Sequence, residues 1–154
     1  LKRPGVATTR SAPLARRARA AGAQLVVVHG ETLVEPVAPG TNRAALECPD
    51  VDLVAHPGLI TPEEAALAAA NGIRLELSAR RGHGLANGHV AALARQAGAG
   101  LVVNSDAHEP SDLVNLEAAR RVALGAGLTP AEAEEAVVSR PAALLKQALE
   151  RRQR

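Results

Sequence analysis

Short apolar runs alternate with alanine-rich stretches along this chain, and this alternation limits the possible folds more than any other feature. The clearest apolar runs are residues 25–29, 53–56, 75–78 and 101–104. Each is almost continuously apolar, as strands buried on both faces of a sheet are. Strands separated by helical stretches are typical of βαβ units, so we predict an α/β protein with a parallel sheet. We expect a further strand to end at Val6.

Helix signals fill the intervals between these runs. Residues 61–64 and 129–132 each read Thr-Pro-x-Glu, in which an N-cap threonine precedes a proline at the first helical position and a glutamate closes a capping box. The other predicted helices span residues 11–21, 87–97 and 111–124, and a last one opens at Pro141. The connection formed by residues 30–50 is long for such a fold, and loops of this length are usually functional or flexible.

The composition excludes several classes of protein. The 154 residues include no Phe, Trp, Tyr or Met, so the core must consist of Leu, Val, Ile and Ala. The single Cys48 excludes an internal disulfide and a thiolate metal cluster. No apolar run approaches the roughly 18 residues of a membrane span, and no signal-peptide pattern opens the chain. We therefore expect a cytoplasmic protein without a membrane partner.

Charge is close to balanced, with 18 basic and 16 acidic residues. The basic clusters are Arg16, Arg17 and Arg19, and then Arg151, Arg152 and Arg154. We interpret both clusters as solvated surface rather than as a nucleic-acid site. The chain also has no aromatic side chains on which unpaired bases could stack, so a nucleic-acid partner is not expected.

Histidine and aspartate residues stand where the predicted strands end. His29 ends one strand, His56 ends the next, and Asp106 and His108 follow the last as an Asp-x-His pair. The carboxyl ends of parallel strands converge on one face, so we expect these four side chains within about 10 Å of one another. One histidine at a strand end is usually a hydrogen-bonded loop residue, but recurrence at three strand ends favours a metal site. Imidazole and carboxylate ligands suit Zn, Mn or Fe.

Other polar residues on the same face have two interpretations each. Glu31 either supports the metal ligands by hydrogen bonding or is an ordinary exposed loop carboxylate. Arg80, Arg81 and His83 follow the strand 75–78, where arginine side chains suit the recognition of a phosphate or a substrate. The alternative for these three residues is solvated loop charge.

Three short motifs of this sequence, taken in order, resemble motifs of a known family. They are His29-Gly30-Glu31-Thr32, Ala55-His56-Pro57-Gly58 and Asn104-Ser105-Asp106-Ala107-His108, which resemble successive motifs of the polymerase-and-histidinol-phosphatase (PHP) superfamily. Residues 80–90 resemble a segment of its histidinol-phosphatase-like members. The resemblance implies a distorted seven-stranded, TIM-like β/α barrel. Residues 1–154 would form a single PHP-like domain, the C-terminal portion of the barrel, without its first strands.

The function implied by the resemblance is a metal-dependent phosphoester hydrolase, a phosphatase that acts on a small phosphorylated molecule with up to three Zn, Mn or Fe ions. His29 and His56 would share one metal, Asp106 would ligate a second and His108 a third, with no catalytic residue beyond these ligands. The family's His-x-His motif does not occur in this sequence, and Ala7 stands where the family has a bridging glutamate. We therefore expect an incomplete ligand set and impaired activity.

A second interpretation stays open. It is a non-catalytic binding or assembly module, similar to the archaeal ribonuclease P subunit that resembles the PHP barrel without its metals. The pI of about 9.3 favours this interpretation, whereas the retained His and Asp residues favour the enzyme. The sequence leaves the substrate and the oligomeric state open.

Overall fold

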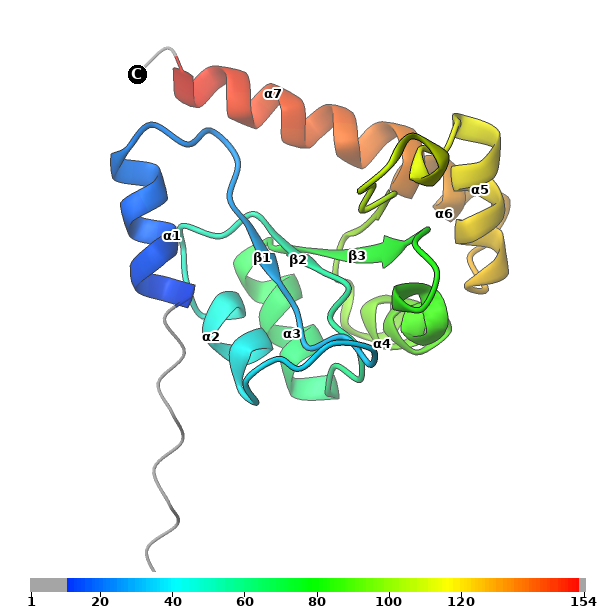
Figure 1. Ribbon diagram of the computed structural model, residues 1–154, viewed down its shortest axis with the longest axis horizontal. Helices are drawn as coiled ribbons and strands as arrows, with labels where there is room; N and C mark the ends of the chain where they lie inside the picture. Colours follow the sequence, from blue (N-terminus) through cyan, green and yellow to red (C-terminus); the bar gives the residue numbers. More distant parts are fainter. Residues whose placement is uncertain (1–10, 153–154) are drawn as a thin grey trace, which may run out of the picture.

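The four apolar runs form one parallel sheet in the computed structural model, which describes residues 11–152 (Figure 1). The strands are β1 (Val27–His29), β2 (Leu53–Ala55), β3 (Arg74–Ser78) and β4 (Leu101–Asn104). They pair in chain order, each parallel to the next. The four predicted strands are thus confirmed. The strand expected to end at Val6, and Ala7 beside it, lie outside the described residues.

Helices connect the strands and follow the last one. They are α1 (Ser11–Ala20), α2 (Thr41–Leu46), α3 (Pro62–Asn71), α4 (Asn87–Ala97), α5 (Leu116–Gly125), α6 (Pro130–Glu134) and α7 (Arg140–Arg152). Two 3-10 turns, η1 (His83–Ala86) and η2 (Pro110–Asp112), follow β3 and β4, and a π-helical segment, η3 (Glu135–Ser139), joins α6 to α7. Both predicted capping boxes are present, at Thr61 and Thr129. The helix α2 is not among the predicted ones, because it is short and Gly40 at its N-cap provides no side-chain cap.

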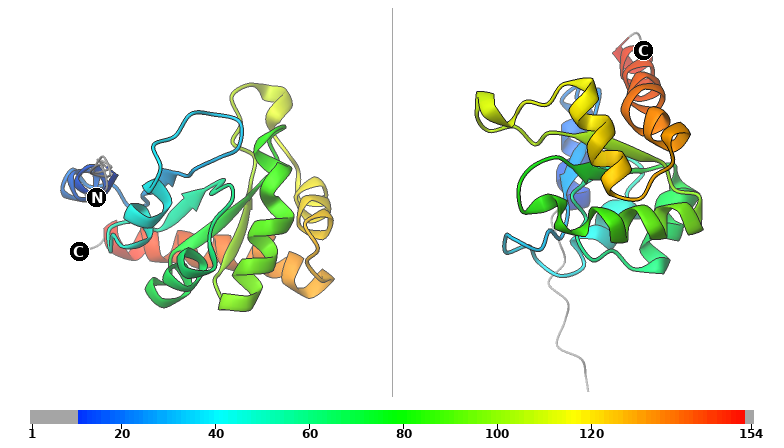
Figure 2. Two further views of the ribbon diagram at one scale, coloured as in Figure 1. Left: turned by 90° about the horizontal axis from the view of Figure 1, so that it is seen from below. Right: turned by 90° about the vertical axis from the view of Figure 1, so that its right-hand side faces the viewer.

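The helices α2, α3 and α4 cover one face of the sheet (Figures 1 and 2). Leu75 and Leu77 of β3 point into this layer and are fully buried. They belong to one core with Ala68 of α3 and Ala94 of α4, which are also fully buried. Because the chain has no aromatic residues, small alanine side chains fill the space between helix and sheet. None of the described helices is long and apolar enough to cross a membrane.

The helix α7 crosses the opposite face of the sheet. Its Leu144 packs with Leu53 of β2 and Val102 of β4 in a small separate cluster. The helix leaves part of this face uncovered, so Val27 is 49% exposed and Leu145 is 61% exposed. The result is an open apolar groove of about 630 Å³ between the sheet and α7.

The described sheet has two free edges, and the predicted seven-stranded barrel is therefore wrong. Among residues 11–152 there are four strands, and β1 and β4 are the outer ones. A barrel requires each strand to pair on both sides. The sequence pattern predicts the individual strands, but the alternation of strands and helices is common to open sheets and barrels, so it does not predict how many strands pair.

The carboxylate of Asp52 links two segments that are far apart in the sequence. It lies just before β2 and its side chain is 3% exposed. Arg19 near the end of α1 forms an ion pair with it, and Nη1 of Arg151 in α7 lies 2.6 Å from its Oδ1. The backbone N–H of Val26 donates a hydrogen bond to Oδ2 at 2.7 Å. The two basic clusters of the sequence therefore meet at one buried carboxylate.

The surroundings of Asp52 set the pH dependence of this link. Burial by itself raises the pKa of Asp52, but the hydrogen bonds from Val26, Arg151 and Arg19 outweigh burial and lower the pKa below the ordinary 3.8. A carboxyl group whose pKa is lower in the folded state stabilises the fold above its unfolded pKa. This stabilisation is lost as the pH falls through the folded pKa.

We predict that Asp52→Asn lowers the free energy of unfolding by about 2 kcal/mol at pH 7, because Arg19 and Arg151 lose their carboxylate partner. Urea denaturation followed by circular dichroism measures the difference between the variant and the wild type. The difference should shrink as the pH falls below about 3.8. Asp50→Asn, which removes a carboxylate with no ion pair among residues 11–152, is the matched control. Equal stability of Asp52→Asn and the wild type at pH 7 would contradict the link.

Candidate functional site

One polar residue follows each strand at the carboxyl edge of the sheet. His29 is the last residue of β1, His56 follows β2, His83 opens the turn after β3, and Asp106 lies just beyond β4. The ring centroids of His29 and His56 are 4.4 Å apart, and those of His56 and His83 are 4.2 Å apart. We call these four residues the strand-end cluster. It lies where open α/β sheets usually bind ligands.

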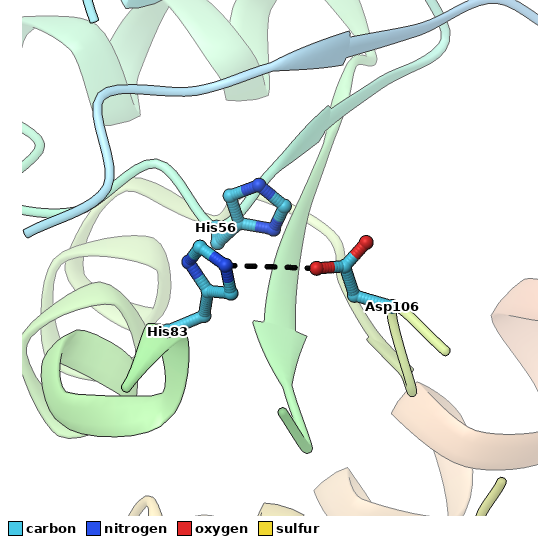
Figure 3. A group of neighbouring side chains, drawn as sticks. All are labelled: His56, His83 and Asp106. Carbon is cyan, nitrogen blue, oxygen red and sulfur yellow. Dashed lines mark ion pairs between the residues drawn. The ribbon is translucent and has the colours of Figure 1, made fainter. Parts of the chain in front are cut away.

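Three members of this cluster are arranged as metal ligands are (Figure 3). His56, His83 and Asp106 each offer one ligand atom, and these atoms lie within 4.8 Å of one another. Nε2 of His83 is 3.6 Å from Oδ2 of Asp106. Nε2 of His56 is buried and has no hydrogen-bond partner among the described residues. Two imidazoles and one carboxylate, with a free nitrogen among them, fit a divalent cation such as Zn, Mn or Fe.

The backbone is strained at two of these residues. Within residues 11–152, His56 (φ 32°) and Asp106 (φ 48°) are the only residues other than glycine with a positive φ. Such conformations cost about 1–3 kcal/mol each and persist only where the surrounding structure imposes them. Both residues belong to the group that could bind a cation, so the fold fixes the direction of their side chains at some cost in stability.

Two buried polar side chains orient the rings. Glu76 in β3 is 2% exposed, and its Oε2 accepts hydrogen bonds from the backbone N–H of His56 at 2.7 Å and from Nδ1 of the same ring at 3.0 Å. This places the proton of a neutral His56 on Nδ1 and leaves the lone pair of Nε2 free. Oγ1 of Thr32 lies 2.6 Å from Nδ1 of His83. Neither Glu76 nor Thr32 is among the predicted site residues. The position of Glu76 between Leu75 and Leu77, in an otherwise apolar strand, is a signal that could have indicated its role. No sequence signal indicates the role of Thr32.

The charge state of His83 also suits a ligand. Burial lowers its pKa and the neighbouring His56 lowers it further, whereas Glu35 and Asp106 raise it and Arg80 lowers it again. The pKa of His83 lies below the ordinary 6.5 as the net result. The ring is therefore neutral near pH 7, which is the form in which histidine binds metals.

The four predicted ligands differ in their position and exposure in the structure. His29, His56 and Asp106 all belong to the strand-end cluster, but the side chain of His29 is half exposed and its Nε2 lies 2.9 Å from Oε2 of Glu35. His108 is exposed, and its Nδ1 lies 2.9 Å from the carbonyl oxygen of Asp106. His83, which was predicted for phosphate or substrate recognition, lies beside His56 and Asp106, whereas the predicted ligand His108 is not in this group.

The residues predicted to support the ligands or to recognise phosphate also differ in position. Oε1 of Glu31 accepts a hydrogen bond from the backbone N–H of Asn42 at 2.9 Å, so Glu31 fixes the start of α2. Nη1 of Arg80 lies 3.2 Å from Oδ2 of Asp106 and forms an ion pair with it. Arg81 is exposed beside the site.

Glycines allow the loops that carry His29 and His56 to touch. A Cβ on Gly30 would lie 2.5 Å from the carbonyl oxygen of Ala55. Gly58 has a φ of 63°, and a Cβ there would overlap the carbonyl of Glu31. Gly30 and Gly58 are therefore required by the packing of the two loops, independently of any role of the histidines.

We predict that long-range ¹H–¹⁵N NMR at pH 8 detects His56 with its proton on Nδ1, because Glu76 accepts from that nitrogen. His89 is the internal control, since its Nε2 lies 2.7 Å from the carbonyl oxygen of Ile60 and should carry the proton instead. A His56 ring protonated on Nε2 would show that this nitrogen is not held ready to bind a cation.

The fold and the strand-end cluster define an α/β protein with a parallel sheet and a polar site at its carboxyl edge. No family model matches this chain. The chain is 47% identical over 133 residues to an uncharacterized protein of Methanocaldococcus jannaschii, MJ1295, in an alignment that covers 86% of this chain and 61% of that protein. It thus spans about three fifths of the length of this relative.

A solved structure has the same fold. It is the cryo-EM structure of archaeal ribonuclease P with mature tRNA, in which one chain matches with a TM-score of 0.64 and 19% sequence identity. The match covers 95% of this chain and 64% of the other.

These comparisons overturn the interpretation as a PHP phosphatase. The fold is that of a chain in a ribonuclease P structure, and the described sheet has four strands. The predictions of a metal-dependent phosphoester hydrolase and of a small phosphorylated substrate are therefore wrong. Gly30 and Gly58 in two of the motifs are required by loop packing, so these glycines do not by themselves indicate a reaction.

Proposed function

We propose that this chain is a non-catalytic binding module whose partners are RNA and other proteins. The observation that carries the proposal is the fold match, which extends over 95% of the chain at a TM-score of 0.64. The matched structure holds archaeal ribonuclease P together with a mature tRNA. The proposed partners, RNA and protein, replace the small phosphorylated substrate expected from the sequence. They also replace the expectation that the chain has no nucleic-acid partner.

The composition supports one mode of RNA binding over another. Without Phe, Trp or Tyr the chain has no aromatic platform for unpaired bases. Its basic residues are almost all arginine, whose planar guanidinium group pairs well with phosphate. The expected target is therefore the backbone of a folded RNA, and the expected affinity depends strongly on salt.

We predict that the chain binds a fluorescein-labelled, folded tRNA transcript with a Kd of about 1–100 μM at low salt, the usual range for binding dominated by phosphate contacts. Fluorescence anisotropy measures the binding, and affinity should fall by at least about tenfold between 50 and 200 mM salt. The same preparation, supplied with Mn or Zn, should not hydrolyse an aryl phosphate. Absence of RNA binding at low salt would contradict the proposal, as would metal-dependent turnover.

Metal binding is a second candidate function, and the unpartnered Nε2 of His56 favours it. We propose that His56, His83 and Asp106 hold one Zn, Mn or Fe ion, since their ligand atoms lie within 4.8 Å of one another. A bound cation would supply positive charge that ties together the loops after β2, β3 and β4. His29 and His108 remain predicted ligands for any further ion.

Two single variants test the ligand set. We expect His83→Gln to weaken Co(II) binding, followed by its visible absorption, by at least about tenfold, because it removes a ligand. His108→Gln should bind Co(II) nearly as the wild type does, since His108 lies outside the group. The reverse pattern would favour the ligands predicted from the sequence over His83. Binding that neither variant changes would contradict both sets.

A further inference from the structure

The small net charge conceals a strong segregation of charge along the chain. Residues 1–30 contain six basic residues and no acidic residue, and residues 140–154 contain five basic residues and one acidic residue. The residues between these two segments include seven basic and fifteen acidic residues. Both ends of the chain are therefore strongly positive, and the middle is strongly negative.

The fold brings the described parts of these two positive segments together. Arg19 of α1 and Arg151 of α7 share the carboxylate of Asp52, and Nη1 of Arg151 also donates to the carbonyl oxygen of Gln24 at 3.2 Å. The end of α1 and the end of α7 accordingly lie near each other in both figures of the whole chain (Figures 1 and 2). Two basic patches that are separate in sequence thus become one surface, with a single buried carboxylate beneath it.

Cations on this surface are available to a ligand. Arg16 and Arg17 on α1 are exposed, and no carboxylate among residues 11–152 forms an ion pair with either of them. Most other arginines among residues 11–152 are paired, including Arg140 at the start of α7. Arg95 binds Glu132, Arg120 binds Glu134, Arg121 binds Glu117 and Arg140 binds Glu135. A guanidinium group without a carboxylate partner can pair with phosphate without first breaking an ion pair.

We propose that the α1–α7 surface binds the phosphate backbone of a folded RNA through Arg16 and Arg17, while Arg19 and Arg151 hold α1 beside α7 through Asp52. This inference rests on the proposed function, and it places the RNA on one side of the molecule. The negative middle segment repels RNA from the remaining surface, so the charge distribution also orients the approach of the RNA. Contacts between arginine and phosphate recognise the shape of the RNA backbone rather than its base sequence.

The chain offers a matched pair of variants for the test. Two helices carry adjacent arginines, Arg16-Arg17 on α1 and Arg120-Arg121 on α5, which lie on opposite sides of the molecule (Figure 1). The double substitutions Arg16→Ala/Arg17→Ala and Arg120→Ala/Arg121→Ala remove the same charge. Each is titrated against the fluorescein-labelled tRNA transcript between 50 and 200 mM salt.

We expect the α1 variant to bind at least about tenfold more weakly at low salt. Its affinity should also depend less on salt: the magnitude of the slope of log affinity against log salt should decrease by about one for each arginine that contacts a phosphate. The α5 variant should stay within about twofold of the wild type. Arg16→Lys/Arg17→Lys, which keeps the charge, should recover most of the affinity lost in the alanine variant.

The outcomes separate this inference from the proposed function. A wild-type chain that does not bind the transcript contradicts the proposed function and, with it, the site. If the wild type binds and the two alanine variants bind equally well, the α1–α7 surface is overturned while RNA binding stands. A loss of affinity in the lysine variant as large as in the alanine variant would also overturn the site, because charge would not be the cause. Circular dichroism of each variant verifies that α1 remains folded.

Discussion

Parallel pairing of neighbouring strands is the constraint on which the candidate site depends. Because β1 to β4 all run in the same direction, the residues that follow them emerge at one edge of the sheet. His29, His56, His83 and Asp106 are spread over almost eighty residues of sequence, yet the rings of the three histidines lie in succession within 4.4 Å of one another. Shifting β2 by one residue would turn His56 to the other side and break its bonds to Glu76.

The sequence predicts the elements of this fold better than it predicts their assembly. Alternating apolar runs and capping boxes locate the four strands and most helices, because these signals act within a few residues. The number of paired strands depends on contacts between distant segments, and the motifs around Gly30 and Gly58 suggested a barrel that the described sheet does not form. The helix α2 lacks a start signal, so the sequence pattern does not predict it.

In the candidate site, too, the sequence predicts the general position but not the detailed arrangement of the side chains. Its position at the strand ends follows from the parallel pattern, which correctly brings His29 and His56 together. The choice between His83 and His108 depends on loop conformation, and the positive φ of Asp106 and the contact of Thr32 with His83 are not encoded in any local pattern. Glu76 lies inside a strand, where the apolar pattern indicates no site residue.

The bond between Arg151 and Asp52 closes a loop of 99 residues. Contacts between residues so far apart form only after much of the intervening chain has been ordered, because loop-closure entropy opposes them. The α1–α7 surface therefore exists only when α7 is packed beside α1. An unfolded chain has the same arginines but does not hold the two helices side by side, so binding at this surface would depend on the fold as well as on charge.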